Sequence, residues 1–169
     1  MSADTADRAG MSPLTVRRVR GALLVWAAVL AAADLAVKAV AEVSLAGGEI
    51  IDLGLLNLRL HYNPGVAFSM GANLPSWVIL VATGLIITGL AWYLLHSAPT
   101  MNKLSRAGGT LLLGGAIGNL IDRLDGRGVV DYLHTGWFAT FNLADVFVTT
   151  GVAVFILATV RRSPEVEQG

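Results

Sequence analysis

Long apolar runs recur four times along the chain, each close to the length that a helix needs to cross a membrane. Such a helix takes roughly 20 consecutive, mostly apolar residues. The clearest run is PSWVILVATGLIITGLAWYLL, residues 75–95, which holds no charged residue. Three further runs, at 21–41, 107–124 and 143–160, carry polar residues near one end. The pattern predicts an all-α membrane bundle of four transmembrane helices.

Between the first two runs, the apolar period changes from that of a helix to that of a strand. In LNLRLHYN, residues 56–63, Leu and Tyr alternate with polar residues, which is typical of a half-buried strand. The preceding GEIIDLGL, residues 48–55, is compatible with a partner strand, and NPG at 63–65 indicates a turn. We therefore predict that 42–73 is an extracytoplasmic β segment, a small β-sheet on the outer face of the bundle.

The start of the chain allows two interpretations. VRRVRGALLVWAAVLAAAD, residues 16–34, has the basic start, apolar core and small residues of a cleaved signal peptide. The apolar pattern resumes after Asp34 and reaches spanning length, which favours an uncleaved first span. Residues 1–16 are polar and aperiodic, so we expect a disordered tail there. Residues 1–169 are interpreted as a single membrane-embedded domain.

The distribution of basic residues predicts how the spans are oriented. With four spans, both termini and the loop at 96–106 lie on one side. That side holds eight of the twelve Lys and Arg residues. Because cytoplasmic loops are enriched in Lys and Arg, both termini are predicted to be cytoplasmic.

Composition narrows the chemistry that the chain can perform. The sequence is 54% apolar and 14% charged, and its net charge of zero argues against nucleic-acid binding. It contains no cysteine, which excludes disulfides, thiolate metal sites and a cysteine nucleophile. The three histidines show no metal-ligand spacing, and we expect no metal and no cofactor. Hydroxyls and carboxylates remain as candidate reactive groups.

The polar residues within the apolar runs fall at one depth, near the predicted extracytoplasmic ends. Ionisable side chains inside a membrane usually face the bundle interior and mark a functional site. The first span contributes two of these residues, the third span three, the following loop one and the fourth span two: Asp34, Lys38, Asn119, Asp122, Arg123, Asp131, Asn142 and Asp145.

Each of these residues also has a local structural explanation. Asp34 and Lys38 have the i,i+4 spacing of a helical ion pair. Asp122 and Arg123 could form a polar helix terminus. In FNLAD, Asn142 is a candidate N-cap, with an acid three residues later in capping-box spacing. These explanations account for the residues one by one but not for their convergence.

Two acids, Asp131 and Asp145, lie fourteen positions apart in VVDYLHTGWFATFNLADVFV, residues 129–148. Two carboxylates that face each other share a proton, because their mutual repulsion raises one pKa. One can then take a proton from water while the other protonates a carbonyl oxygen, which is general acid–base hydrolysis of a peptide. The spacing allows the intervening loop to fold Asp131 back over the start of the fourth span.

Five motifs in order give the chain a resemblance to a known family. They are DLAVK, NPGVAFS, GGAIGNLIDRL, VVDYL and FNLADVFV, and the resemblance that they carry extends over about residues 20–162. Together they resemble the lipoprotein signal peptidases, the bacterial signal peptidase II family of membrane aspartyl proteases. Such enzymes remove the signal peptide from diacylglyceryl-modified prolipoproteins, cleaving before the lipidated cysteine.

The resemblance implies roles for individual residues. Asp131 and Asp145 match the catalytic dyad of the family. The residues that match its substrate-binding positions are Asn63, Gly65, Asn119, Arg123 and Asn142. Those that match its structural-support positions are Asp34, Lys38 and Asp122. The expected partners are lipid-modified prolipoproteins and membrane lipid, and we expect a monomer. The expected location is the bacterial inner membrane, with the active site at its extracytoplasmic face.

Three alternatives compete with this interpretation. A small proton- or ion-coupled transporter would also contain buried charges, but the cytoplasmic half shows no matching polar path, and there is no internal repeat. A non-catalytic scaffold would use the small residues of GGTLLLGGAIG only for close helix packing. A different intramembrane aspartyl protease would be expected to carry a G-x-G-D motif, which is absent.

Overall fold

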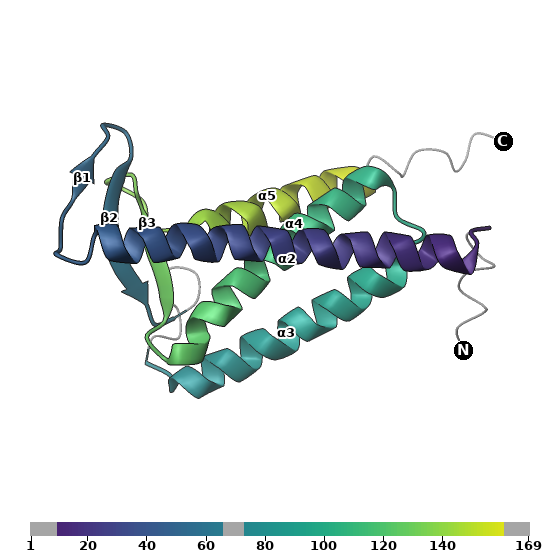
Figure 1. Ribbon diagram of the computed structural model, residues 1–169, viewed down its shortest axis with the longest axis horizontal. Coiled ribbons are helices and arrows are strands. Elements are labelled where there is room, and N and C mark those ends of the chain that lie inside the picture. Colours follow the sequence, from purple (N-terminus) through teal and green to yellow (C-terminus); the bar gives the residue numbers. More distant parts are fainter. Residues whose placement is uncertain (1–9, 66–72, 161–169) are drawn as a thin grey trace.

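The computed structural model describes residues 10–65 and 73–160, which form a helical bundle with a small sheet at one end (Figure 1). The four long helices and the short 3-10 helix that follows the third of them are α2 (Pro13–Ser44), α3 (Ser76–Ser97), α4 (Lys103–Asp122), α5 (Leu143–Val160) and η2 (Arg123–Asp125). The strands are β1 (Ile51–Asp52), β2 (Asn57–Asn63) and β3 (Val129–His134).

Helix α4 occupies the centre of the bundle. It packs against α2, α3 and α5, and its contact with α5 is the most extensive. A buried apolar cluster joins α2, α3 and α4 in the half away from the sheet, through Leu23, Leu94 and Leu113. The sheet and the start of α5 lie at the opposite end (Figure 1). The core therefore fixes the helices at one end and leaves the other end for the polar residues.

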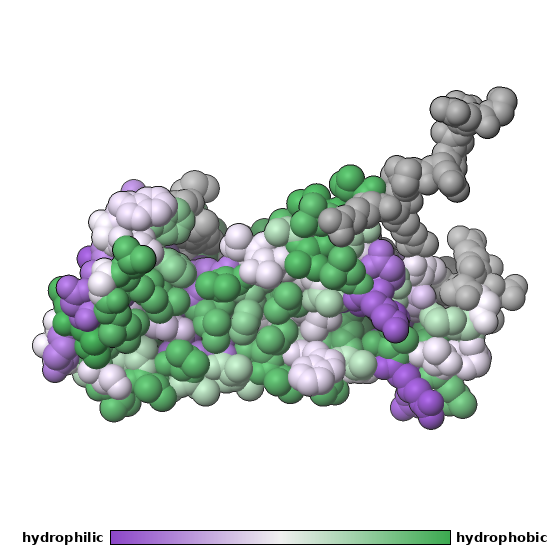
Figure 2. All heavy atoms as spheres, turned by 90° about the horizontal axis from the view of Figure 1, so that it is seen from above, coloured by the Kyte–Doolittle hydropathy of each residue, from purple (hydrophilic) through white to green (hydrophobic). Residues whose placement is uncertain are grey.

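Helices α2, α3 and α5 are each long and apolar enough to cross a membrane. Large apolar side chains such as Trp26, Leu85 and Ile156 are exposed along them. Figure 2 shows hydrophobic side chains over the middle of the visible face, with hydrophilic ones mostly toward its two ends. An apolar surface of this extent is suited to contact with lipid. The described residues thus form a mostly helical protein with three candidate spans.

The third predicted span corresponds to α4, which is not among the three candidates identified by length and composition. It is 20 residues long, but Lys103, Arg106 and Asp122 lie near its ends, and several of its glycines are buried. Because α4 is surrounded by other helices, it needs less apolar surface than a helix that faces lipid.

Glycines allow α4 and α5 to approach each other closely. A Cβ atom on Gly108 would lie 2.7 Å from the backbone nitrogen of Phe155, and one on Gly151 would lie 2.5 Å from that of Leu112. Neither helix backbone can move away without separating the pair. Close helix packing is what the small residues of GGTLLLGGAIG predict.

The sheet has the order β1–β2–β3, with both neighbouring pairs antiparallel. The predicted strand in LNLRLHYN is confirmed as β2, and its predicted partner is the two-residue β1. The assignment of VVDYL to a loop was wrong, because residues 129–134 form β3. Val129 through Tyr132 are all buried, so this strand lacks the alternation that marks a half-buried strand.

The boundaries of α2 correct two further predictions. The helix begins at Pro13, so the end of the predicted disordered tail, 1–16, is helical. The Ser12 hydroxyl accepts a hydrogen bond from the backbone nitrogen of Thr15 at 3.3 Å, and proline occupies the first turn, which together favour a helix start. At its other end, α2 extends to Ser44, into the predicted β segment 42–73. Residues 1–9 of the tail and 66–72 of the β segment lie outside the described residues.

Candidate active site

A pocket of about 340 Å³ opens where the sheet meets the ends of α4 and α5. Asp131 and Asp145 both line it, together with Asn63, Asn119 and Arg123. The remaining lining is mostly apolar and comes from β3, the loop before α5, and α5 itself: Val129, Phe138, Ala139, Thr140, Phe141, Val148 and Thr149. Two acids distant in the sequence therefore share one cavity with a mixed polar and apolar wall.

Asp131 enters the pocket from β3 and is 2% exposed. Its Oδ1 accepts a hydrogen bond from Asn142 Nδ2 at 2.7 Å, and its Oδ2 accepts one from Asn63 Nδ2 at 3.3 Å. The pairing of β2 with β3 places Asn63 beside this carboxylate. Both oxygens are therefore held by amide donors from different elements.

Asp145 lies in the first turn of α5. Its backbone nitrogen donates to Asn142 Oδ1 at 3.0 Å, and its Oδ2 accepts from the backbone nitrogen of Asn142 at 3.2 Å. This reciprocal pair confirms the capping box predicted from FNLAD. Asn119 of α4 donates from Nδ2 to Asp145 Oδ1 at 2.8 Å. The carboxylate is thus fixed from its own helix and from a neighbouring one.

The loop between β3 and α5 folds back on the strand, as the spacing of the two acids allows. The backbone nitrogens of Tyr132 and Leu133 donate to the carbonyl oxygen of Phe141 at 3.0 and 2.8 Å. The nitrogen of Phe141 donates in turn to the carbonyl oxygen of Leu133 at 2.9 Å. These bonds place Asn142 next to Asp131. The fully buried Asn142 side chain then links the two acids.

Lys38 is at the centre of a second buried network, beneath the pocket. Its ammonium lies 2.7 Å from both Asp34 Oδ2 and Asp122 Oδ2, and it donates to Asn119 Oδ1 at 2.8 Å. These three partners match the three donors of an ammonium group. Lys38 is 2% exposed and Asp34 0%. The i,i+4 pair predicted from the sequence is confirmed, and it reaches α4 as well.

The two acids of this network also accept hydrogen bonds from the backbone. Asp34 Oδ1 accepts from the nitrogen of Ala144 at 2.8 Å, in the first turn of α5. Asp122 Oδ2 accepts from the nitrogen of Val130 at 3.2 Å, in β3. The network therefore connects α2 and α4 to β3 and α5, the two elements that carry the pocket acids.

Arg123, directly after α4, holds the turn at the end of β2. Its Nη1 donates to the carbonyl oxygen of Asn119 at 2.6 Å, and its Nη2 donates to that of Gly65 at 2.9 Å. The Asn63 side chain accepts from the nitrogen of Gly65 at 3.0 Å. Among the described residues, nothing bonds to the buried Nε of Arg123, a pocket-lining residue.

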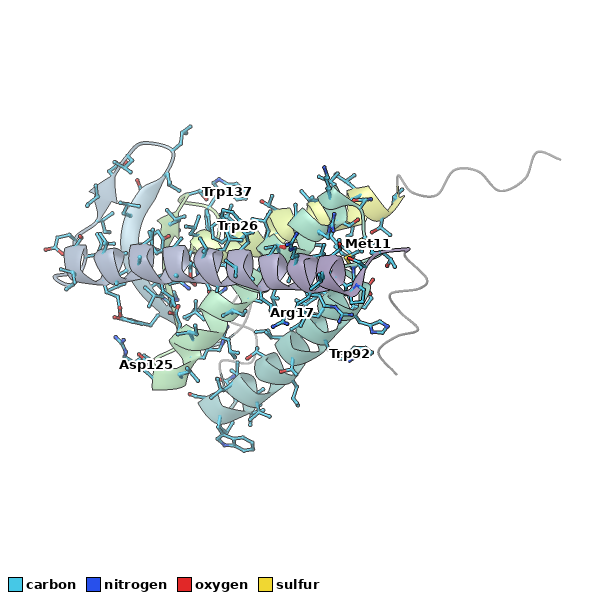
Figure 3. The ribbon with its side chains drawn as sticks, turned by 45° about the vertical axis from the view of Figure 1, so that its right-hand side comes forward. Met11, Arg17, Trp26, Trp92, Asp125 and Trp137 are labelled. Atoms are coloured by element: carbon cyan, nitrogen blue, oxygen red, sulfur yellow. The ribbon has the colours of Figure 1, made fainter. Side chains whose placement is uncertain are left out.

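The sequence did not predict the side-chain contacts that hold the loop before α5, which lines the pocket. Arg59, on the polar side of β2, donates from Nε and Nη2 to the Thr140 hydroxyl at 3.1 and 2.9 Å. Phe138 packs edge-on against Trp137 and Phe141, with ring centroids 5.6 and 6.1 Å apart. Trp137 itself is exposed (Figure 3). The only signal in the sequence for the contact between Arg59 and Thr140 was the position of Arg59 in an alternating strand.

The pKa of Asp131 is raised to about 6, chiefly by burial and, to a smaller extent, by the negative charge of Asp145. The hydrogen bonds from Asn142 and Asn63 oppose this shift without cancelling it. Close to pH 6, Asp131 is therefore protonated in about half of the molecules. Within residues 10–65 and 73–160, no group of three or more His, Cys, Asp or Glu side chains is placed to hold a metal ion.

Asp131→Asn is expected to unfold less readily than the unmodified protein near neutral pH. Because the pKa of Asp131 is about 6 when folded and 3.8 ordinarily, ionising this acid costs the folded state about 3 kcal/mol. Between these values the folded protein binds more protons than the unfolded chain, so its stability falls as pH rises through about 6. Unfolding by titration with a denaturing detergent gives the free energy of unfolding. That of the variant should exceed that of the unmodified protein at about pH 7 and equal it at about pH 4. An advantage that does not change with pH would contradict this account.

The two carboxylates, the buried Asp131 and the half-buried Asp145, share a pocket at the end of an apolar bundle, and comparison with known proteins gives the family. A family model described as signal peptidase (SPase) II matches residues 26–161. The lipoprotein signal peptidase of Bartonella quintana (strain Toulouse) is 42% identical over 123 residues, which cover 69% of this chain and 72% of that protein. The chain belongs to the signal peptidase II family.

Other relatives cover more of the chain. The lipoprotein signal peptidase of Mesorhizobium japonicum is 40% identical over 140 residues, or 80% of this chain and 82% of that protein. That of Rhodococcus jostii (strain RHA1) is 34% identical over 166 residues, or 92% of this chain and 80% of that protein. The family membership predicted from the five motifs is confirmed, and these relatives give no support to a transporter.

Two solved structures, each described as a bacterial membrane enzyme, share the fold. One has a TM-score of 0.75 at 25% identity and covers 88% of this chain and 95% of that chain. The other has a TM-score of 0.71 at 26% identity and covers 85% and 95%. Together with the apolar helices, these similarities indicate a bacterial membrane protein.

Proposed function

We propose that this protein is an aspartic endopeptidase that removes the signal peptide from diacylglyceryl-modified prolipoproteins, cleaving before the lipidated cysteine. The observation that carries the proposal is the placement of Asp131 and Asp145 in one pocket, linked through Asn142. The names of the relatives support prolipoproteins as the substrates. A site built on carboxylates also suits a chain without cysteine.

The two acids work as a dyad that holds one proton. The ionised carboxylate removes a proton from a water molecule, whose oxygen then attacks the carbonyl carbon of the scissile bond. The protonated carboxyl donates its proton to the carbonyl oxygen. When the tetrahedral intermediate collapses, the C–N bond breaks, the ionised carboxylate takes a proton from one hydroxyl of the intermediate, and the other acid gives its proton to the leaving nitrogen, which restores the dyad. The hydrogen bonds from Asn119 and Asn142 keep both acids in place through these steps.

The other pocket residues position the substrate. Asn63, Gly65 and Arg123 form a connected polar edge, from which amide and guanidinium groups can bind carbonyl oxygens of the peptide or of the lipid ester. Opposite them, Phe138, Phe141 and Val148 provide an apolar wall for lipid chains. Asn119 lines the pocket and can bind both Asp145 and the substrate, whereas the fully buried Asn142 orients the acids and does not contact the substrate directly. Asp34, Lys38 and Asp122 support the site without contacting the substrate.

We place the protein in the inner membrane with four spans, α4 included, and with both termini in the cytoplasm. A 20-residue helix is about 30 Å long, which equals the hydrocarbon thickness of a bilayer. The sheet and the pocket then lie at the extracytoplasmic face, where water is available for hydrolysis. A monomer suffices, since both acids come from the same chain.

The substrate requirement can be tested with purified protein in detergent. We expect cleavage of a diacylglyceryl-modified prolipoprotein just before the modified cysteine, and at least about a 100-fold lower kcat/KM for the same protein without lipid, since remote binding energy contributes to catalysis. Mass spectrometry of the products gives the cleavage position, and gel quantification gives the rate. Equal cleavage of both substrates would contradict the lipid requirement. Vesicle ion flux that depends on Asp131 and Asp145 would instead favour the transporter.

A further inference from the structure

A second groove, of about 410 Å³, lies between α2 and α4 in the half of the bundle away from the active site. Leu23, Trp26 and Leu30 line it from α2, and Leu111 lines it from α4. Trp26 projects from α2 and is largely exposed (Figure 3). Arg106, at the start of α4, also belongs to the lining. The groove is thus apolar along its length and basic at one end.

The length of the groove corresponds to one leaflet of a bilayer. Its lining on α2 extends from Val19 to Leu30. At about 1.5 Å per residue, this distance is roughly 16 Å. Half of a hydrocarbon core about 30 Å thick is about 15 Å. A single acyl chain lying along α2 would therefore fill the groove from the headgroup region to the middle of the bilayer.

The charges around the basic end favour an anionic headgroup. Arg17, Arg18 and Lys103 are exposed at the same end of the bundle as Arg106. Arg20 is half-buried and donates from Nε to the carbonyl oxygen of Leu95 at 2.7 Å. In contrast, every acidic residue within 10–65 and 73–160 belongs to the sheet-side half, from Asp34 onward in the sequence. Over the described residues, this end of the bundle is therefore basic without a compensating acid.

We propose that this groove is a binding site for an anionic phospholipid, with one acyl chain between α2 and α4 and the phosphate at Arg106. In the orientation proposed above, the lipid comes from the cytoplasmic leaflet. Basic pockets between membrane helices on that side are suited to anionic headgroups. The bound lipid contacts both helices that carry the Lys38 network, so it stabilises their packing from the end opposite the active site.

The test uses the full chain, purified in detergent and delipidated, and measures lipid binding by native mass spectrometry. Phosphatidylglycerol and phosphatidylcholine with identical acyl chains are compared at equal concentration. We expect at least about a fivefold preference for phosphatidylglycerol, with a higher melting temperature, since a ligand that binds only the folded state stabilises it. Arg106→Gln should remove most of that preference. Equal binding of the two lipids by the unmodified protein would overturn the proposal.

Lys103→Gln is the matched control, because it removes the same charge from an exposed position outside the groove lining. It should keep the preference for phosphatidylglycerol. If both variants lose this preference equally, the effect is general charge attraction, and the proposal of a specific site is overturned. Ala22→Phe narrows the groove at an exposed position and should weaken phosphatidylglycerol binding while circular dichroism stays unchanged. Full competition by glycerol phosphate would assign the site to a free phosphate and contradict a lipid site.

Discussion

Asp131→Asn and Asp145→Asn are each expected to reduce cleavage of a diacylglyceryl-modified prolipoprotein by about 1,000-fold or more. Asparagine has nearly the size of aspartate but cannot accept or deliver the proton, and general acid–base groups contribute about 100- to 10,000-fold each. The pocket holds both acids, so neither can replace the other in its role. The measurement is kcat/KM with purified protein in detergent, followed by detection of the released signal peptide.

Asp125→Asn is the matched control for both substitutions. Asp125 is an exposed acid in η2 whose Oδ2 pairs with Arg127 Nε at 2.6 Å, outside the pocket lining. This variant should cleave within about twofold of the unmodified protein, because exposed ion pairs contribute little. Circular dichroism must show that all three variants are folded. If the two pocket variants are folded and still cleave within tenfold of the unmodified rate, the dyad is wrong and these acids are structural.

The sequence predicted α3 and α5 well because their apolar runs are long and uninterrupted, whereas α2 begins eight residues before its predicted run. The predicted range 143–160 coincides with α5, and 75–95 differs from α3 by one residue at its start and two at its end. The strand β2 was recognisable because one of its faces is polar. By contrast, β3 is buried over Val129 to Tyr132, so its pattern is indistinguishable from that of other short apolar segments.

The residues of the site could be predicted from the sequence, but most of the hydrogen bonds between them could not. Asn142 and Asp145 are three residues apart, so their capping box could be predicted from local spacing. The hydrogen bond between Lys38 and Asn119 joins residues 81 positions apart, and no local rule predicts it. The contact of Arg59 with Thr140 has the same separation, and it depends on the folding of the loop over the pocket. Long-range contacts of this kind depend on the packing of whole helices.

The convergence of polar residues at one depth was therefore the informative feature of the sequence. This convergence could be recognised without knowing which side chains bind each other. The predicted spans fix the depth of each residue in the membrane but leave its hydrogen-bond and ion-pair partners undetermined. The structure supplies the pairings. They show two layers: the pocket acids with their asparagines, and the Lys38 network beneath them.

Lys38→Met is expected to lower the free energy of unfolding by about 3–5 kcal/mol, the usual effect of removing one partner from a buried ion pair. The substitution leaves Asp34 and Asp122 as buried carboxylates without their cation. It also removes a donor from Asn119, which orients Asp145, so cleavage should fall as well. Unfolding by sodium dodecyl sulfate, followed by circular dichroism, gives the free energy of unfolding.

Adding Asp34→Asn to Lys38→Met separates the loss of charge balance from the loss of packing. In the unmodified network one cation faces two carboxylates, so Lys38→Met leaves two anions and the double variant leaves one. Asparagine can still accept the hydrogen bond from the nitrogen of Ala144. The double variant should therefore be more stable than Lys38→Met by at least about 1 kcal/mol, since it no longer leaves two uncompensated buried charges. If the effects of the two substitutions simply add, the cost of Lys38→Met comes from lost packing, and the ionic network does not couple the four elements.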